Sequence, residues 1–146
     1  MNNSIRISCD LTNLQEVRDF VREFLSAYAL KEKVREDIVL AVDEISANLI
    51  IHANKKDKSK FIDLTISNRN GNLLFEFTDW GTSYNPATFR IPNIEDHIHQ
   101  GRKGGLGMYL VHRIMDKVEF TSANGTNYSR LYKNVSGQPK TNQVLR

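Results

Sequence analysis

Three short polar segments stand out from an otherwise ordinary apolar scaffold. The first holds Glu44 and Asn48, one helical turn apart inside a helical pattern. The second holds Asp79 and Gly81, where a strand pattern ends, and the third is the glycine-rich run 104–107 before another helical pattern. A carboxylate and an amide oxygen are ligands that suit Mg²⁺, and a glycine-rich helix entrance suits phosphate. In this order, the three segments indicate a site for a magnesium nucleotide.

The first segment carries its polar residues on an apolar helix end. Glu44, Asn48 and His52 are spaced by four residues, so they line one side of a helix that the pattern places from about residue 33 to 52. An isolated pair of this kind is usually a solvated helix face. Here the neighbouring run 49–51 is apolar, and burying a carboxylate beside it is costly unless the carboxylate has partners. The apolar surroundings therefore favour a functional role.

The other two segments are weaker when each is taken alone. Asp79 could accept a hydrogen bond from an exocyclic amine while Gly81 lets the backbone approach a flat ring, although a turn Asp that bonds its own backbone is common. The free N–H groups after the run 104–107 attract phosphate, and Arg102 and Lys103 could add charge. A flexible hinge is an equal alternative for this run. Only the combination of segments discriminates.

The rest of the pattern predicts the elements that position these segments. Alternation of apolar and polar residues predicts strands over 5–8, 61–67, 73–77, 118–121 and 128–132. Helical spacing predicts helices from about Thr12 to Tyr28, over 33–52 and over 107–115. Asn-Gly pairs at 70–71 and 124–125 predict tight turns. Helices followed by antiparallel strands predict an α+β two-layer sandwich.

Two stretches lack a pattern. Between Gly81 and Gly104 the period is broken by prolines and glycine, and a run of this length in a small domain predicts a functional lid, with a short helix around 86–89. From Gly137 onward the chain is polar and patternless, which predicts a disordered tail. We therefore expect one domain over residues 1–136 and a tail over 137–146.

Composition bounds the class of protein. The chain has 146 residues and a net charge of +3, with charged residues scattered except for a lysine-rich stretch at 55–60. No aromatic residues interleave that stretch, so it predicts a solvated loop and no direct nucleic-acid binding. Cys9 is the only cysteine, and the sequence offers neither a signal peptide nor an apolar run of membrane-spanning length. We expect a cytoplasmic protein that does not bind membranes.

Together the segments resemble the N, G1 and G2 boxes of the GHKL ATP-binding superfamily, which includes gyrase, MutL and histidine kinases. The nearest resemblance is to the bacterial anti-sigma factor serine kinases. That branch reads like Ala41-Val42-Asp43-Glu44…Asn48…His52-Ala53, then Asp79-x-Gly81…Asn85-Pro86, then Gly105-Leu106-Gly107-Met108-Tyr109-Leu110-Val111. The likeness extends from the first strand to Leu131. It implies a Bergerat-type fold, in which helices cover one face of a mixed, mostly antiparallel sheet.

The resemblance also implies roles for the matching residues, with ATP and Mg²⁺ as cofactors. Glu44 would be catalytic and polarise the attacking hydroxyl, and Asn48 would hold Mg²⁺. Asp79 would accept from the adenine amine with Gly81 beneath the ring, and Thr126 would reach adenine through water. The residues expected around the phosphates are Arg102, Lys103, Gly105, Leu106 and Gly107. His52 ends the family's N box, and we interpret it as structural.

The implied function is that of an ATP-dependent serine/threonine protein kinase. Its partners would be a small antagonist protein, which it phosphorylates, and a sigma factor, which it binds; a homodimer is left open. The alternatives are a non-catalytic ATP-dependent protein-binding module and a sensor subunit in a bacterial partner-switching pathway. Glu44 favours catalysis over the non-catalytic module. One departure concerns Ser83, which stands where the family usually has glycine and would loosen the adenine pocket if that position needs a positive φ.

Overall fold

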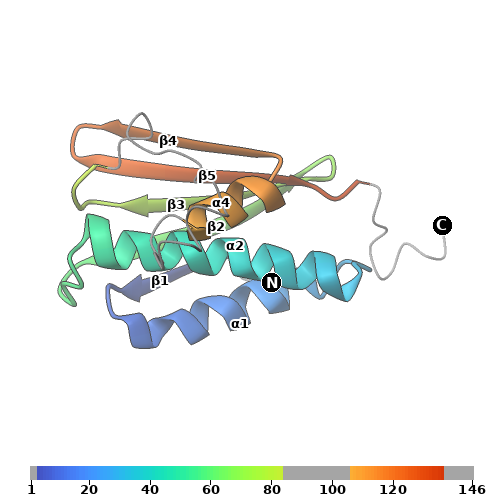
Figure 1. The fold of residues 1–146 in the computed structure, drawn as a ribbon, viewed down its shortest axis with the longest axis horizontal. Helices are drawn as coiled ribbons and strands as arrows, with labels where there is room; N and C mark the ends of the chain where they lie inside the picture. Colours follow the sequence, from blue (N-terminus) through green and yellow to red (C-terminus); the bar gives the residue numbers. More distant parts are fainter. Residues whose placement is uncertain (1–2, 84–105, 137–146) are drawn as a thin grey trace, which may run out of the picture.

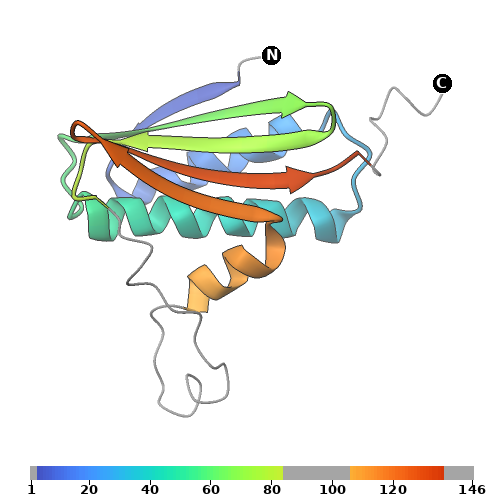
Figure 2. The same ribbon diagram turned by 90° about the horizontal axis from the view of Figure 1, so that it is seen from above.

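The computed structural model of this protein describes residues 3–83 and 106–136. The predicted lid, its short helix and the tail lie outside the described residues, as do Arg102, Lys103 and Gly105. Within the described part, helices α1 (Leu14–Leu25), α2 (Glu32–Asn48) and α4 (Leu106–Ile114) lie on one side of a sheet, as Figures 1 and 2 show. This arrangement confirms the predicted α+β two-layer sandwich.

The sheet contains five strands in the order β1-β2-β3-β5-β4. Every pairing among the described strands is antiparallel. The strands are β1 (Ser4–Ser8), β2 (Phe61–Arg69), β3 (Asn72–Asp79), β4 (Lys117–Ala123) and β5 (Thr126–Asn134). Because β3 is central and antiparallel to β5, the end of β3 lies beside the start of β5, with Asp79 opposite Asn127.

Both predicted Asn-Gly turns are present. Asn70 and Gly71 have φ values of 55° and 89°, and they join β2 to β3. Asn124 and Gly125 have φ values of 55° and 79°, and they join β4 to β5. Positive φ at both central residues is the geometry that suits the twist of a two-residue hairpin, and asparagine and glycine adopt it at the lowest cost.

The core lies between the inner face of the sheet and the helices. Alternate residues of β3 point into it, so Leu73, Phe75 and Phe77 are fully buried while their neighbours are partly exposed. The next inward position is Asp79, which is equally buried. The regular alternation of β3 therefore carries a carboxylate into the end of an apolar core, where it needs polar partners.

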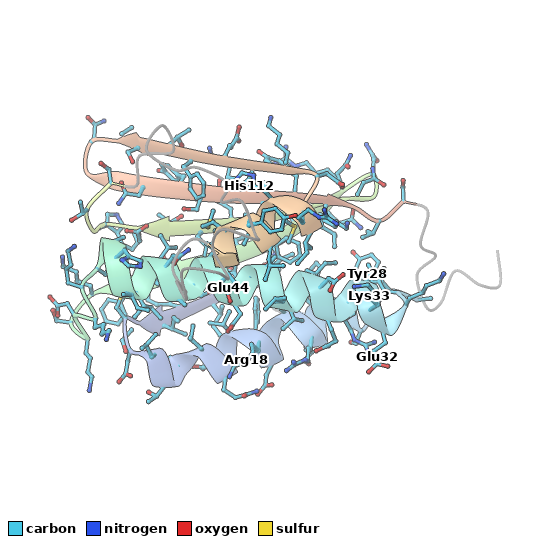
Figure 3. The ribbon with its side chains drawn as sticks, in the orientation of Figure 1. Arg18, Tyr28, Glu32, Lys33, Glu44 and His112 are labelled. Carbon is cyan, nitrogen blue, oxygen red and sulfur yellow. The ribbon has the colours of Figure 1, made fainter. Side chains whose placement is uncertain are left out.

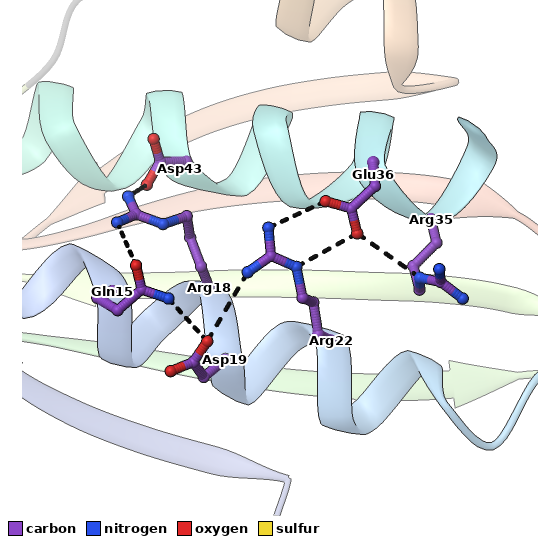
Figure 4. Close-up of polar contacts among 7 residues, drawn as sticks. All are labelled: Gln15, Arg18, Asp19, Arg22, Arg35, Glu36 and Asp43. Carbon is purple, nitrogen blue, oxygen red and sulfur yellow. Dashed lines mark hydrogen bonds and ion pairs between the residues drawn. The ribbon is translucent and has the colours of Figure 1, made fainter. Parts of the chain in front are cut away.

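Helices α1 and α2 are joined by ion pairs along their outer edge as well as by apolar packing (Figure 4). Arg18 Nη1 lies 2.7 Å from Asp43 Oδ1, and Arg22 Nη2 lies 2.9 Å from Glu36 Oε1. These side chains are partly exposed, so each pair contributes little stability. The Arg18–Asp43 pair lies on the turn of α2 that carries Glu44, because Asp43 directly precedes Glu44. No helix in the described ranges is long and apolar enough to cross a membrane.

Candidate functional site

Asp79 is the centre of a buried polar cluster at the end of β3. Its Oδ1 accepts hydrogen bonds from Gly81 N at 2.9 Å and from Asn127 Nδ2 at 3.1 Å, with a longer contact from Asn54 Nδ2 at 3.4 Å. Its Oδ2 is buried and has no hydrogen-bond partner among the described residues. A buried acceptor without a donor is costly. Asp79 therefore keeps one acceptor oxygen unused, while three protein N–H groups converge on the other oxygen.

Asn54 reaches this cluster because α2 continues into a π-helical turn, Leu49–Ala53. The backbone N–H of Asn54 donates to Leu49 O at 3.0 Å, and its side-chain Nδ2 donates to the same carbonyl at 2.8 Å. Ala53 O accepts from Thr82 N at 2.8 Å, just beyond β3. Single π-turns are frequent at functional sites. Here the Thr82–Ala53 hydrogen bond connects the π-turn after α2 to the chain just beyond β3.

Gly81 is required by a close approach within the protein. A Cβ at this position would lie 2.5 Å from Asn54 Oδ1 and 2.7 Å from Ala53 C, so no other residue fits without movement. The sequence suggested that glycine is needed here so that a flat ring can approach the backbone. The contact with Ala53 and Asn54 is a second reason for a glycine at this position. Ser83 is not among the described residues with positive φ. The condition under which Ser83 would loosen the pocket is therefore not met.

Glu44 lies against the start of α4. A Cβ at Gly107 would lie 2.8 Å from Glu44 Cδ, so the glycine in the first turn of α4 makes room for the carboxylate. Figure 3 shows Glu44 on α2 at this junction. Burial raises the pKa of Glu44 above its ordinary value, and the nearby carboxylate of Asp43 raises it further. The carboxyl group of Glu44 is thus partly buried beside Gly107 at the start of α4, an environment that suits a proton acceptor.

The raised pKa of Glu44 predicts that Glu44→Gln stabilises the fold at neutral pH. The folded chain holds this proton more tightly than the unfolded chain, so stability decreases as pH rises from the ordinary pKa of 4.5 through the raised value. Glutamine removes the charge, and we expect the melting temperature to rise by on the order of 2 °C at pH 7. Calorimetric melting at several pH values should show this gain shrinking towards pH 4. A lower melting temperature at pH 7 would mean that the ionised carboxylate stabilises the fold.

The donor set suits Mg²⁺ held mainly by a nucleotide. Asn48 is the last residue of α2 and is partly buried, one turn beyond Glu44. Among the described residues no group of three His, Cys, Asp or Glu side chains could hold a metal ion. Mg²⁺ commonly takes one or two protein oxygens together with phosphates and waters. An amide oxygen beside a carboxylate fits that mode of binding.

The structure also describes two other predicted residues, Thr126 and Leu106. Thr126 is the first residue of β5 and is partly buried, but its neighbour Asn127 is the residue that bonds Asp79. Leu106 begins α4. Asn54 and Asn127 were not predicted from sequence. Asn54 carries a weak signal as a polar residue directly after the apolar helix end, and Asn127 carries one as the inward position of a strand.

A cavity of about 620 Å³ lies apart from these residues. It is lined by the first half of α2 and by α4, including Lys33, Asp37, Leu40, Tyr109 and Arg113. None of the predicted site residues that the structure describes lines this cavity. The candidate nucleotide site is defined instead by the buried cluster at Asp79 and by the Glu44–Gly107 contact.

Comparison with known proteins places this geometry in a family. A family model for the histidine kinase-like ATPase domain matches residues 7–133. The serine-protein kinase RsbW of Halalkalibacterium halodurans is 32% identical over 94 residues, which cover 62% of this chain and 57% of that protein. This chain therefore aligns with little more than half the length of that relative.

Two crystal structures share the fold. One is the SiaB-SiaC complex from Pseudomonas aeruginosa, with a TM-score of 0.61 and 16% identity over 90% of this chain and 89% of that chain. The other contains RsbU and RsbW domains from Mycobacterium tuberculosis, with a TM-score of 0.59 and 14% identity over 92% of this chain and 33% of that chain. At these identities the likeness concerns the fold alone. The family model covers most of the sequence, and the chain belongs to the histidine kinase-like ATPase domain family.

Proposed function

We propose that this chain is an ATP-dependent regulatory serine/threonine protein kinase of the anti-sigma factor type. It would phosphorylate a small antagonist protein and bind a sigma factor. The nucleotide part of the proposal is carried by the buried carboxylate of Asp79, one oxygen of which has no hydrogen-bond donor among the described residues. The kinase part is supported by the position of Glu44 and by the similarity to a serine-protein kinase.

In this proposal the cluster at Asp79 binds the adenine base, and the end of α2 binds the magnesium ion and the phosphates. Asp79 Oδ2 accepts a hydrogen bond from the adenine amine, and the tight packing of Gly81 on Ala53 and Asn54 fixes the turn beside it. Asn48, with Glu44 nearby, would hold Mg²⁺, which neutralises phosphate charge when bound. The site thereby positions the nucleotide, and positioning with charge neutralisation is most of what phosphoryl transfer requires.

Glu44 then acts on the acceptor. Its carboxylate takes the proton from the serine hydroxyl as the hydroxyl oxygen forms a bond to the γ-phosphorus. The bond between the γ-phosphorus and the bridging oxygen breaks, and ADP leaves. The raised pKa of Glu44 makes its carboxylate a better proton acceptor than an exposed glutamate.

The proposal predicts selective binding of adenine nucleotides. In titration calorimetry with Mg²⁺, we expect the full chain to bind ADP at least about tenfold more tightly than GDP, because guanine presents a carbonyl where adenine presents the amine. The buried cluster at Asp79 offers an acceptor, which a carbonyl cannot satisfy. Equal affinity for the two nucleotides would remove the adenine role of Asp79, and absence of binding to both would remove the nucleotide site.

A further inference from the structure

Two acceptor atoms in the candidate site are buried without hydrogen-bond partners among the described residues. They are Asp79 Oδ2 and Asn54 Oδ1, and both side chains are completely buried. The two side chains contact each other through Asn54 Nδ2 and Asp79 Oδ1 at 3.4 Å. Most buried polar atoms in folded proteins have a partner, so two such acceptors on adjoining side chains point to one missing donor group.

The orientation of the Asn54 amide is fixed by its own hydrogen bonds. Its Nδ2 donates to Leu49 O at 2.8 Å and approaches Asp79 Oδ1, which leaves Oδ1 as the spare atom. Asn127 provides a contrast, because its Nδ2 also donates to Asp79 but its Oδ1 accepts from Ser122 Oγ at 2.7 Å. Of the two amides that bond Asp79, only Asn54 therefore has an acceptor to offer.

Gly81 packs directly against this acceptor. A Cβ at Gly81 would lie 2.5 Å from Asn54 Oδ1, so the glycine backbone lies close to that oxygen and no side chain fits between them. The N–H of Gly81 also donates to Asp79 Oδ1, which holds the carboxylate with Oδ2 as its free side. The glycine thus positions Asp79 and leaves Asn54 Oδ1 uncovered by a side chain.

We propose that Asn54 determines base specificity by accepting one hydrogen of a purine 6-amino group while Asp79 Oδ2 accepts the other. The proposal rests on the nucleotide-binding function above and adds Asn54 as a second acceptor. An amine carries two N–H donors and satisfies both oxygens, whereas a 6-oxo group brings a third acceptor to the same place. The cluster thereby selects 6-aminopurine nucleotides and rejects 6-oxopurine nucleotides.

The test compares ADP with purine riboside 5′-diphosphate, which has hydrogen in place of the amine. Titration calorimetry with Mg²⁺ should show the parent chain binding the analogue about 75-fold more weakly than ADP, since the bond to the Asp79 carboxylate contributes about 15-fold and the bond to the Asn54 amide about fivefold. In Asn54→Ala only the Asp79 acceptor remains, and the ratio should fall to about 15-fold. Asn127→Ala is the matched control, because it also removes an amide donor from Asp79 but no spare acceptor; its ratio should stay near that of the parent.

The ratio separates specificity from support of the fold. If Asn54 only caps the π-turn, Asn54→Ala weakens both ligands equally and keeps the parent's ratio, which would overturn the proposal. A parent chain that binds ADP but does not distinguish the analogue would overturn it too, with the nucleotide site intact. A parent chain that binds neither ligand would overturn the proposed function itself.

A second measurement does not depend on whether the variant folds. N6-methyl-ADP retains one N–H, so the parent chain should bind it at least about fivefold more weakly than ADP, and N6,N6-dimethyl-ADP about 75-fold more weakly. Equal affinity for ADP and N6-methyl-ADP would show that only one hydrogen of the amine is used, and Asn54 would lose its assigned role.

Discussion

Replacing Glu44 by glutamine is expected to lower phosphoryl transfer by roughly 10²–10⁴-fold, the usual contribution of a general base, while leaving Mg-ADP binding within about threefold of the parent. Glutamine keeps the size of the side chain and one acceptor oxygen, so the contact with Gly107 is preserved. What the variant loses is the ability to accept a proton from the serine hydroxyl. The measurement is a single-turnover assay with labelled ATP and a candidate antagonist protein, together with a nucleotide titration of both forms.

Glu36→Gln is the matched control for this experiment. Glu36 lies on the same helix and pairs with Arg22 on the outer edge of α2, where its carboxylate has no place in the proposed site. Transfer by this variant should equal that of the parent. Loss of nucleotide binding in Glu44→Gln would place Glu44 in the metal shell and end its assignment as a base. A parent chain that binds ATP but transfers no phosphoryl group would favour the non-catalytic binding module.

The sequence predicts the fold well because local rules and burial agree along most of the chain. The Asn-Gly pairs at 70–71 and 124–125 specify positive φ, and the structure has it at all four residues. The alternation of β3 predicts which residues face the core, and Phe75 and Phe77 are fully buried as that pattern requires. These features depend on backbone geometry within a few residues, which is what a sequence pattern records.

The site is only partly predictable, because its contacts join residues that are distant in the chain. Asn54 meets Asp79 through a π-turn that the helical pattern does not distinguish from a continued α-helix. Asn127 meets Asp79 because of the antiparallel register of β3 and β5. The family resemblance had pointed instead to Thr126, one residue away. Gly107 was expected at phosphate, and the structure adds that it also makes room for Glu44. None of these three contacts can be predicted from a local sequence pattern, because each joins segments that only the tertiary structure brings together.

The second large effect is expected at Asp79, where Asp79→Asn should weaken ADP binding by about 100-fold and abolish the preference for adenine over guanine. Three N–H groups converge on Oδ1, from Gly81, Asn127 and Asn54, so the amide oxygen of the variant must take that position. Its NH₂ group then replaces Oδ2 and presents a donor to the donor amine of adenine. Loss of a hydrogen bond to a charged group, with this repulsion added, accounts for a change of about two orders of magnitude.

The fold should survive this substitution, because the three donors keep their acceptor and the new amide has the same shape as the carboxylate. Circular dichroism and thermal melting would establish this before nucleotide titration. Asp63→Asn is the control, since Asp63 pairs with Arg6 on the outer face of β2 and the variant should bind ADP as the parent does. If Asp79→Asn bound ADP with the affinity of the parent, the free oxygen of Asp79 would not be the adenine acceptor. The proposed role of Asn54 would then fail as well, because Asn54 Oδ1 and Asp79 Oδ2 are assigned to the same amino group.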